Sequence, residues 1–152
     1  QTGGKAWTHV VANVPGIPKN AWVSTVEASR YDKGTAYVTF DCHTMGDWKT
    51  YAYKNTDFGK TWTAFTSSEF KGYAHVIRED VVNKNMLFLG TEFGLFISLD
   101  GGQNWAQMKA NIPDVGVRDI AIHPREHDLI LATHGRGIII FDDLTTLRAI
   151  TA

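Results

Sequence analysis

Residues 55–62 of this 152-residue chain have the sequence Asn55-Thr56-Asp57-Phe58-Gly59-Lys60-Thr61-Trp62. The same pattern returns 43 residues later as Ser98-Leu99-Asp100-Gly101-Gly102-Gln103-Asn104-Trp105. In both stretches Asn or Ser comes first, Asp third, Gly fifth, Thr or Asn seventh and Trp last. A motif repeated at a fixed spacing indicates a fold built from similar units, so this repeat decides the fold class.

The repeat extends beyond the motif. Gly94 and Gly137 are 43 residues apart, as are Asp100 and Asp143, although the Gly and Trp expected after Asp143 are missing. At the other end, residues 4–7 resemble the tail of another copy. A period near 40 residues, built from short apolar runs, is typical of a β-propeller with one four-stranded blade per repeat. We therefore predict an all-β fold, a β-propeller segment of about three four-stranded blades plus one extra strand.

Runs of β-branched and aromatic residues bounded by turn residues give the strand boundaries. Residues 1–20 are predicted to hold the outer strand of a preceding blade, residues 6–14, and a linker. Blade one is residues 21–67, blade two is residues 68–110, and an incomplete blade three is residues 111–152. The predicted strands, from inner to outer in each blade, are 22–28, 35–41, 50–54 and 62–66; 75–79, 86–90, 94–98 and 105–109; and 117–122, 129–133 and 137–141. Only residues 144–152 have a helical pattern, and a weak one.

Three blades and a spare strand do not close a ring, because closed propellers typically have four to eight blades. Three interpretations remain open. The chain is the C-terminal part of a larger propeller, or it self-assembles into a ring, or the three-blade unit stands alone. The sequence favours the first.

The composition is that of an ordinary globular protein, with 43% hydrophobic residues and a formal net charge of −1. The near-neutral charge and the absence of Lys/Arg clusters argue against a nucleic-acid partner. No apolar run is long enough to span a membrane, and the single cysteine, Cys42, has no partner for an internal disulfide. His123 and His127 are four residues apart, but Pro124 between them disfavours the helix that a zinc site would need. We predict no metal and no cofactor.

The repeated motif resembles the Asp-box, or BNR repeat, of sialidases, sortilin-type Vps10 domains and other propellers. The stretches 53–62, 90–105 and 123–143 resemble more closely a group of bacterial sortilin-like or glycosyl-hydrolase-like repeat proteins. This resemblance implies an exported bacterial protein, located in the periplasm, at the cell surface or outside the cell. It also places each motif on the hairpin between the third and fourth strands of a blade.

The motif predicts structure rather than catalysis. Its Asp carboxylate is expected to accept hydrogen bonds from backbone N–H groups of the turn, its Gly to adopt a conformation that other residues resist, and its Trp to fill the space between blades. The six residues with these structural roles are Asp57, Gly59, Trp62, Asp100, Gly102 and Trp105.

Function is expected in the loops that join the second to the third strand and the fourth to the next first strand, because loops on a rigid scaffold carry binding sites. The loop at residues 41–49 is eight residues longer than its counterpart in blade two. A decorated solvent loop and a ligand-contact loop explain this insertion equally well. His134 and Arg136 are expected to form a polar cluster with Glu92, in which Arg136 either binds an anionic ligand or makes a ring-stabilising ion pair. The candidate binding residues are His43, Asp47, Trp48, His75, Glu92, Arg118, His134 and Arg136.

Three functions remain open from the sequence. The first is a non-catalytic module that binds a protein, peptide or glycan, or that acts as a scaffold. The second is part of a glycoside hydrolase, sialidase-like or related, with catalytic residues partly outside this chain. That chemistry needs two positioned carboxylates or a Tyr nucleophile with an acid, and no such pair stands out here. The third is a structural subunit of an extracellular assembly, joined through exposed strand edges. We predict no catalytic residue and favour the first function.

Overall fold

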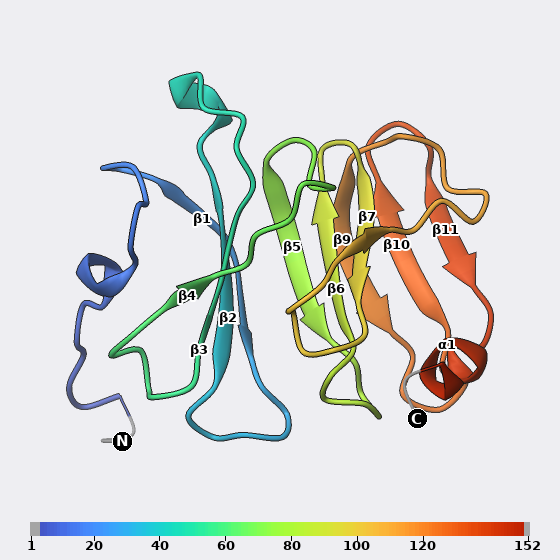
Figure 1. The fold of residues 1–152 in the computed structure, drawn as a ribbon, viewed down its shortest axis with the longest axis horizontal. Helices are drawn as coiled ribbons and strands as arrows, with labels where there is room; N and C mark the ends of the chain where they lie inside the picture. Colours follow the sequence, from blue (N-terminus) through green and yellow to red (C-terminus); the bar gives the residue numbers. More distant parts are fainter. Residues whose placement is uncertain (1–3, 151–152) are drawn as a thin grey trace.

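The computed structural model describes residues 4–150, which form three antiparallel sheets placed side by side in chain order (Figure 1). Each sheet is one blade. Blade one consists of β1 (Trp22–Ala28), β2 (Ala36–Asp41), β3 (Tyr51–Asn55) and β4 (Thr63–Ala64). Blade two consists of β5 (Ala74–Glu79), β6 (Leu87–Thr91), β7 (Gly94–Ser98) and β8 (Ala106–Gln107). Blade three has three strands, β9 (Val117–Ile122), β10 (Leu129–Thr133) and β11 (Ile138–Phe141). The all-β propeller class predicted from the repeat is thereby confirmed.

The loops divide between two ends of the sheets. One end, the loop face, carries the loops after the second strand of each blade and those after β4 and β8, including the short 3₁₀ helix η2 (His43–Met45). The hairpins between the third and fourth strands lie at the other end, together with the short helix α1 (Thr145–Ala149). The predicted outer strands are shortened to two residues each, because β4 and β8 pair with their neighbours over only two positions.

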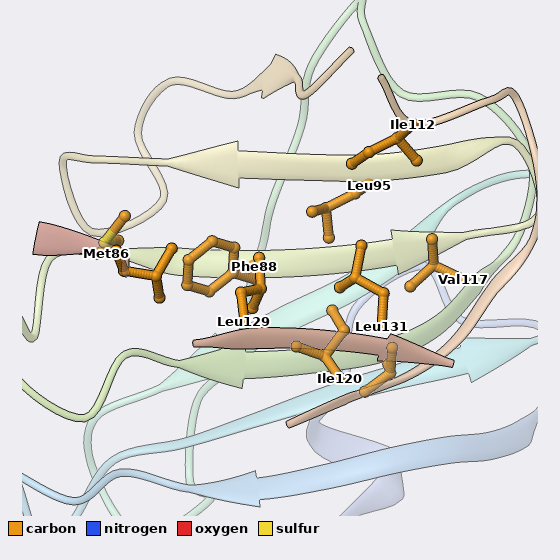
Figure 2. Packing of buried hydrophobic residues seen from close by; sticks show 10 residues of the cluster. Met86, Phe88, Leu95, Ile112, Val117, Ile120, Leu129 and Leu131 are labelled. Carbon is orange, nitrogen blue, oxygen red and sulfur yellow. The ribbon is translucent and has the colours of Figure 1, made fainter. Parts of the chain in front are cut away.

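The core lies between the blades. Figure 2 shows Phe88 and Leu95 of blade two packed against Ile120 and Leu131 of blade three, all fully buried or nearly so. A second cluster joins blades one and two through residues such as Tyr37. Because successive strand residues point to opposite faces, each blade offers one apolar face to each neighbour.

The predicted extra strand at residues 6–14 is wrong. Those residues contain the 3₁₀ helix η1 (Val11–Asn13) and no strand, and the Trp7 side chain is 90% exposed. Within the described residues no neighbouring strand of a preceding blade exists for this segment to pair with. Instead, Val14 packs on the free face of blade one against Val38 and Phe40, and Asn13 Nδ2 donates to the Gly59 carbonyl over 2.9 Å.

The C-terminal helix α1 is fixed by a buried ion pair. Arg148 donates through Nε and Nη2 to the two Asp80 carboxylate oxygens over 2.9 and 2.7 Å. The Asp80 side chain is fully buried, and it also accepts from the backbone N–H groups of Val82 and Asn83. Burial alone would raise the pKa of Asp80, but these donors and the charge of Arg148 outweigh burial and hold the pKa below its ordinary value.

The Asp residues of the two box turns, residues 55–62 and 98–105, accept the same backbone hydrogen bonds. Asp57 Oδ1 accepts from the N–H groups of Lys60 and Thr61 at 3.0 and 2.9 Å. Asp100 Oδ1 accepts at the same distances from the residues three and four positions on. The predicted role of the carboxylate as a backbone acceptor is thereby confirmed in both copies.

The two Trp residues of the box turns differ. Trp105 Nε1 donates to the Gly102 carbonyl at 3.0 Å. The corresponding carbonyl in the first copy, Gly59, accepts from Asn13 instead, and the buried Nε1 of Trp62 has no partner among the described residues. In the first box turn, therefore, the Gly carbonyl accepts from Asn13 of the preceding segment, whereas in the second it accepts from the Trp of the same turn.

The outward face of blade three is apolar and open. Ile138 and Ile140 are 69% and 57% exposed, whereas Leu95, which precedes Ile138 by 43 residues, is completely buried against blade three. Blade three thus has the apolar face with which the other two blades contact their next neighbour, but no neighbour covers it among residues 4–150. No helix in the same range is long and apolar enough to cross a membrane.

Candidate functional site

Four predicted residues from blades two and three meet at the loop face in one hydrogen-bonded group, which we call the polar cluster: His75, Glu92, Arg118 and His134. His75 Nε2 donates to Glu92 Oε2 over 2.9 Å. Arg118 Nη1 lies 3.3 Å from His75 Nδ1, and its Nη2 lies 3.0 Å from His134 Nδ1. Because Arg118 can only donate, both Nδ1 atoms are acceptors in this arrangement.

Charge in the polar cluster is balanced by an ion pair between Arg118 Nη2 and Glu92 Oε2 at 3.2 Å. Burial would by itself raise the pKa of Glu92, but hydrogen bonds from His75 and Tyr73 and the charge of Arg118 outweigh burial, so that pKa lies below its ordinary value. Burial lowers the pKa of His75, and Arg118 lowers it further against the opposing effect of Glu92. At neutral pH the cluster therefore holds a carboxylate, a guanidinium and an uncharged, buried imidazole.

An aromatic group from the long loop of blade one continues the polar cluster. The His43 ring stacks on Tyr73 with centroids 4.5 Å apart, and Trp48 meets the same Tyr73 edge-on at 5.5 Å. Tyr73 in turn contacts the His75 ring edge-on at 4.8 Å. Asp41 Oδ1 lies 2.6 Å from His43 Nδ1 and fixes the orientation of that ring. Six of the eight predicted residues are thereby connected across all three blades.

The two other predicted residues lie outside this connected group. Asp47 holds its own loop together by accepting from the Lys49 N–H and the Tyr51 hydroxyl. Arg136 is exposed, and within residues 4–150 the cationic partner of Glu92 is Arg118, not Arg136. The expected contact of Arg136 with Glu92 is therefore not formed. The reason is that Arg118 comes from the inner strand β9, which packs directly against blade two.

Tyr73 and Asp41 were not among the predicted binding residues. Tyr73 precedes β5 directly and is 4% exposed, so its ring forms the buried link between the aromatic and polar groups. Its position just before an inner strand, two residues from His75, was the available signal. Asp41 ends β2, two residues before His43, a spacing at which a carboxylate often bonds the following loop.

The Glu92 carboxylate of this site is stabilised in its charged form. A glycosidase acid needs a carboxyl group with a raised pKa, whereas Glu92 is held as an anion by three partners. The exposed groups are the Trp48 ring, the Arg118 guanidinium and His134. Among residues 4–150, no group of three or more His, Cys, Asp or Glu side chains is arranged to hold a metal ion.

Comparisons with known proteins support the fold alone. No protein-family model matches the chain, and no curated protein matches it. Solved structures do match. The GH74 xyloglucanase from Xanthomonas campestris is 18% identical with a TM-score of 0.69, over 93% of this chain and 23% of that one. The GH74 enzyme from Niastella koreensis is 20% identical with a TM-score of 0.66, over 80% of this chain and 21% of that one.

A second kind of protein with the same fold is YCF48, solved bound to a D1 peptide. It is 12% identical with a TM-score of 0.55, over 81% of this chain and 37% of that one. YCF48 from Cyanidioschyzon merolae is 18% identical with a TM-score of 0.53, over 80% of this chain and 38% of that one. The chain thus spans less than two fifths of each of these proteins. All four are propellers, so they agree with the blade architecture.

Proposed function

We propose that this chain is a non-catalytic binding part of a β-propeller, and that its loop face binds a protein or peptide ligand. The observation that carries the proposal is the connected group from Trp48 to His134. It presents an exposed aromatic ring beside an exposed guanidinium on a rigid scaffold, and aromatic and Arg side chains dominate binding energy at protein interfaces. The peptide-bound state of YCF48, a propeller of the same fold, is compatible with this function.

A binding measurement tests the proposal. Backbone amide signals of the loop face are followed by NMR while a pool of short peptides is added. We expect saturable shifts in the loop at residues 41–49 and near Arg118, and Arg118→Ala should abolish them. Arg125→Ala is the matched control, because the Arg125 side chain is 81% exposed at the opposite end of β9 and, among residues 4–150, forms its ion pair with the neighbouring Glu126. Loop signals that stay unresponsive to every peptide would count against the proposal.

The alternative function is part of a glycoside hydrolase. Structural likeness to the two GH74 enzymes favours testing it, although the likeness extends over less than a quarter of either enzyme. Catalysis predicts turnover of a chromogenic glycoside that is lost in Glu92→Ala or Asp47→Ala. The absence of turnover across a glycoside panel would refute the hydrolase function. If peptide binding were observed as well, binding would be the function that remains.

The open face of blade three supports a larger ring as the working form of the protein. Exposed Ile138 and Ile140 are expected to pack on another blade, either of a longer polypeptide or of a second copy, which would join two sets of three blades into six. Light scattering on residues 1–152 separates the two sources. A dimer that Ile138→Asp with Ile140→Asp converts to monomer indicates closure between copies. A wild-type monomer or a polydisperse aggregate indicates blades from a longer polypeptide.

We place such a protein outside the cytoplasm, by its resemblance to exported bacterial repeat proteins. Fractionation of cells that express the full-length protein tests this location. Recovery in the cytoplasmic fraction would refute it.

A further inference from the structure

A groove runs along the outer strand of blade one. Its larger part, of about 500 Å³, lies between Thr61, Thr63 and Phe65 on one side and Gly101–Gln103 of the second box turn on the other. A second part, of about 340 Å³, extends toward the loop face and includes Trp48 and Phe70. Phe65 and Thr66, which directly follow β4, line both parts, so the two parts adjoin at these residues. We call the two parts together the edge groove.

The strand beside this groove has free backbone groups. Thr63 pairs with Lys54, and the Phe65 N–H donates to the Ala52 carbonyl at 2.8 Å. Because antiparallel residues alternate between bonding their partner strand and facing away from it, the N–H and C=O of Ala64 point away from β3. Ala64 is exposed, and within residues 4–150 neither of these groups has a hydrogen-bond partner.

An open edge of this kind selects for one type of ligand. Unpaired N–H and C=O groups at strand spacing match the backbone of another extended chain, and peptides bind many proteins by adding a strand to such an edge. Sugars lack the regular alternation of donor and acceptor that continues a sheet. The hollow beside β4 leaves room for the side chains that an added strand would turn toward blade two.

The lining indicates which side chains fit. Phe65 and Phe70 give the groove an apolar floor, and Trp48, 57% exposed, lies at its end near the loop face. Lys54 lines the larger part and Lys49 the smaller, and none of the lining residues is Asp or Glu. An apolar or aromatic residue next to an acidic one therefore complements this surface.

We propose that the edge groove binds an extended polypeptide segment with apolar and acidic residues, which adds to blade one as a fifth strand beside β4. The inference rests on the proposed binding function. It adds that the bound peptide runs from the outer edge of blade one to the loop face. Trp48 lines the edge groove and also contacts Tyr73 of the aromatic group. One peptide can thus contact β4 and the aromatic group together.

The test uses synthetic peptides of about ten residues, since the stretch 61–67 corresponds to about 20 Å of extended chain. An array of such peptides of random sequence is screened against the protein, and the best binders are titrated by fluorescence polarisation. Ala64→Pro removes the outward N–H, and an edge strand tolerates proline when the lost N–H faces solvent. Ala64→Ser is the matched control, because it keeps that N–H in a side chain of similar size.

We expect Ala64→Pro to weaken peptide binding about tenfold or more and Ala64→Ser to change it less than about twofold. The selected peptides should be enriched in acidic and aromatic residues. In the wild-type protein, hydrogen exchange of the Ala64 amide should slow when peptide is bound. If Ala64→Pro fails to fold, peptides N-methylated at single positions replace it, and alternate positions should lose binding to the wild-type protein.

The outcomes separate this inference from the function on which it rests. Peptide binding that Arg118→Ala abolishes and Ala64→Pro leaves unchanged would overturn the edge groove and keep the loop face. Binding that is equally weakened by Ala64→Pro and Ala64→Ser would also overturn the strand-addition geometry. No binding of any peptide would overturn both proposals.

Discussion

The two box turns give a matched pair of glycines for a stability experiment. Gly59 and Gly102 both have positive φ, +83° and +97°, so an alanine at either position is strained by about 1 kcal/mol. Their surroundings differ. A Cβ on Gly59 would meet Val10 at an ordinary contact distance of 3.5 Å, whereas a Cβ on Gly102 would overlap the Phe65 ring.

The Phe65 ring has little freedom to move away from such a Cβ. It is 8% exposed and packs edge-on against Trp105 at 5.3 Å. Forcing an extra methyl group into a packed core typically costs about 1–3 kcal/mol. Gly59→Ala should therefore destabilise the protein by about 1 kcal/mol, and Gly102→Ala by about 2–4 kcal/mol.

Urea denaturation at pH 7, followed by tryptophan fluorescence, gives both free energies of unfolding. The difference between the two variants isolates the packing cost, because the backbone cost is common to both. Equal destabilisation by the two substitutions would refute the reasoning, since it would mean that the Phe65 ring yields without cost. A larger destabilisation by Gly59→Ala than by Gly102→Ala would also contradict the packing argument.

Two ionic interactions give further predictions. Arg148→Met should destabilise the protein by about 2–4 kcal/mol in urea denaturation, because it leaves the fully buried Asp80 carboxylate without its cation. As a control, Arg125→Met at an exposed ion pair should change the free energy of unfolding by less than about 0.5 kcal/mol. Since the folded pKa of Asp80 is below its ordinary value of 3.8, its stabilising contribution is complete above that pH and is lost as the pH falls through the folded pKa. The effect of Arg148→Met should therefore shrink below about pH 4, and a constant effect down to acid pH would exclude this ion pair as its cause. Arg118→Ala should raise the pKa of His75, because the guanidinium disfavours the charged imidazole, and an unchanged His75 titration by NMR would contradict the contact.

The sequence repeat was sufficient for the blades because it is set by local chemistry. A carboxylate that caps a turn and a glycine with positive φ act within eight residues. Asp57 and Asp100 therefore predict their hairpins independently of the rest of the chain. The same locality explains the error at residues 6–14. Outer strands carry little sequence signal of their own, and whether one forms depends on a neighbouring strand that the described chain does not provide.

The site was partly predictable for a similar reason. The inserted loop and the positions at strand ends indicated His43, Trp48, His75 and Glu92, because blade topology places such residues at one face. Topology did not decide which cation would pair with Glu92. Arg118 and Arg136 belong to the same blade, and only the packing of β9 against blade two brings Arg118 within 3.2 Å.

The sequence by itself determined the fold class, the positions of three blade repeats and the turn contacts of the box Asp residues, because these follow from periodicity and turn chemistry within single repeats. The tertiary structure alone decided the polar cluster, the buried Asp80–Arg148 pair and the edge groove. Each of these joins residues from different repeats, whose spacing depends on how the blades pack. Side-chain volumes at the blade interfaces set that packing, and no local pattern in the chain records it.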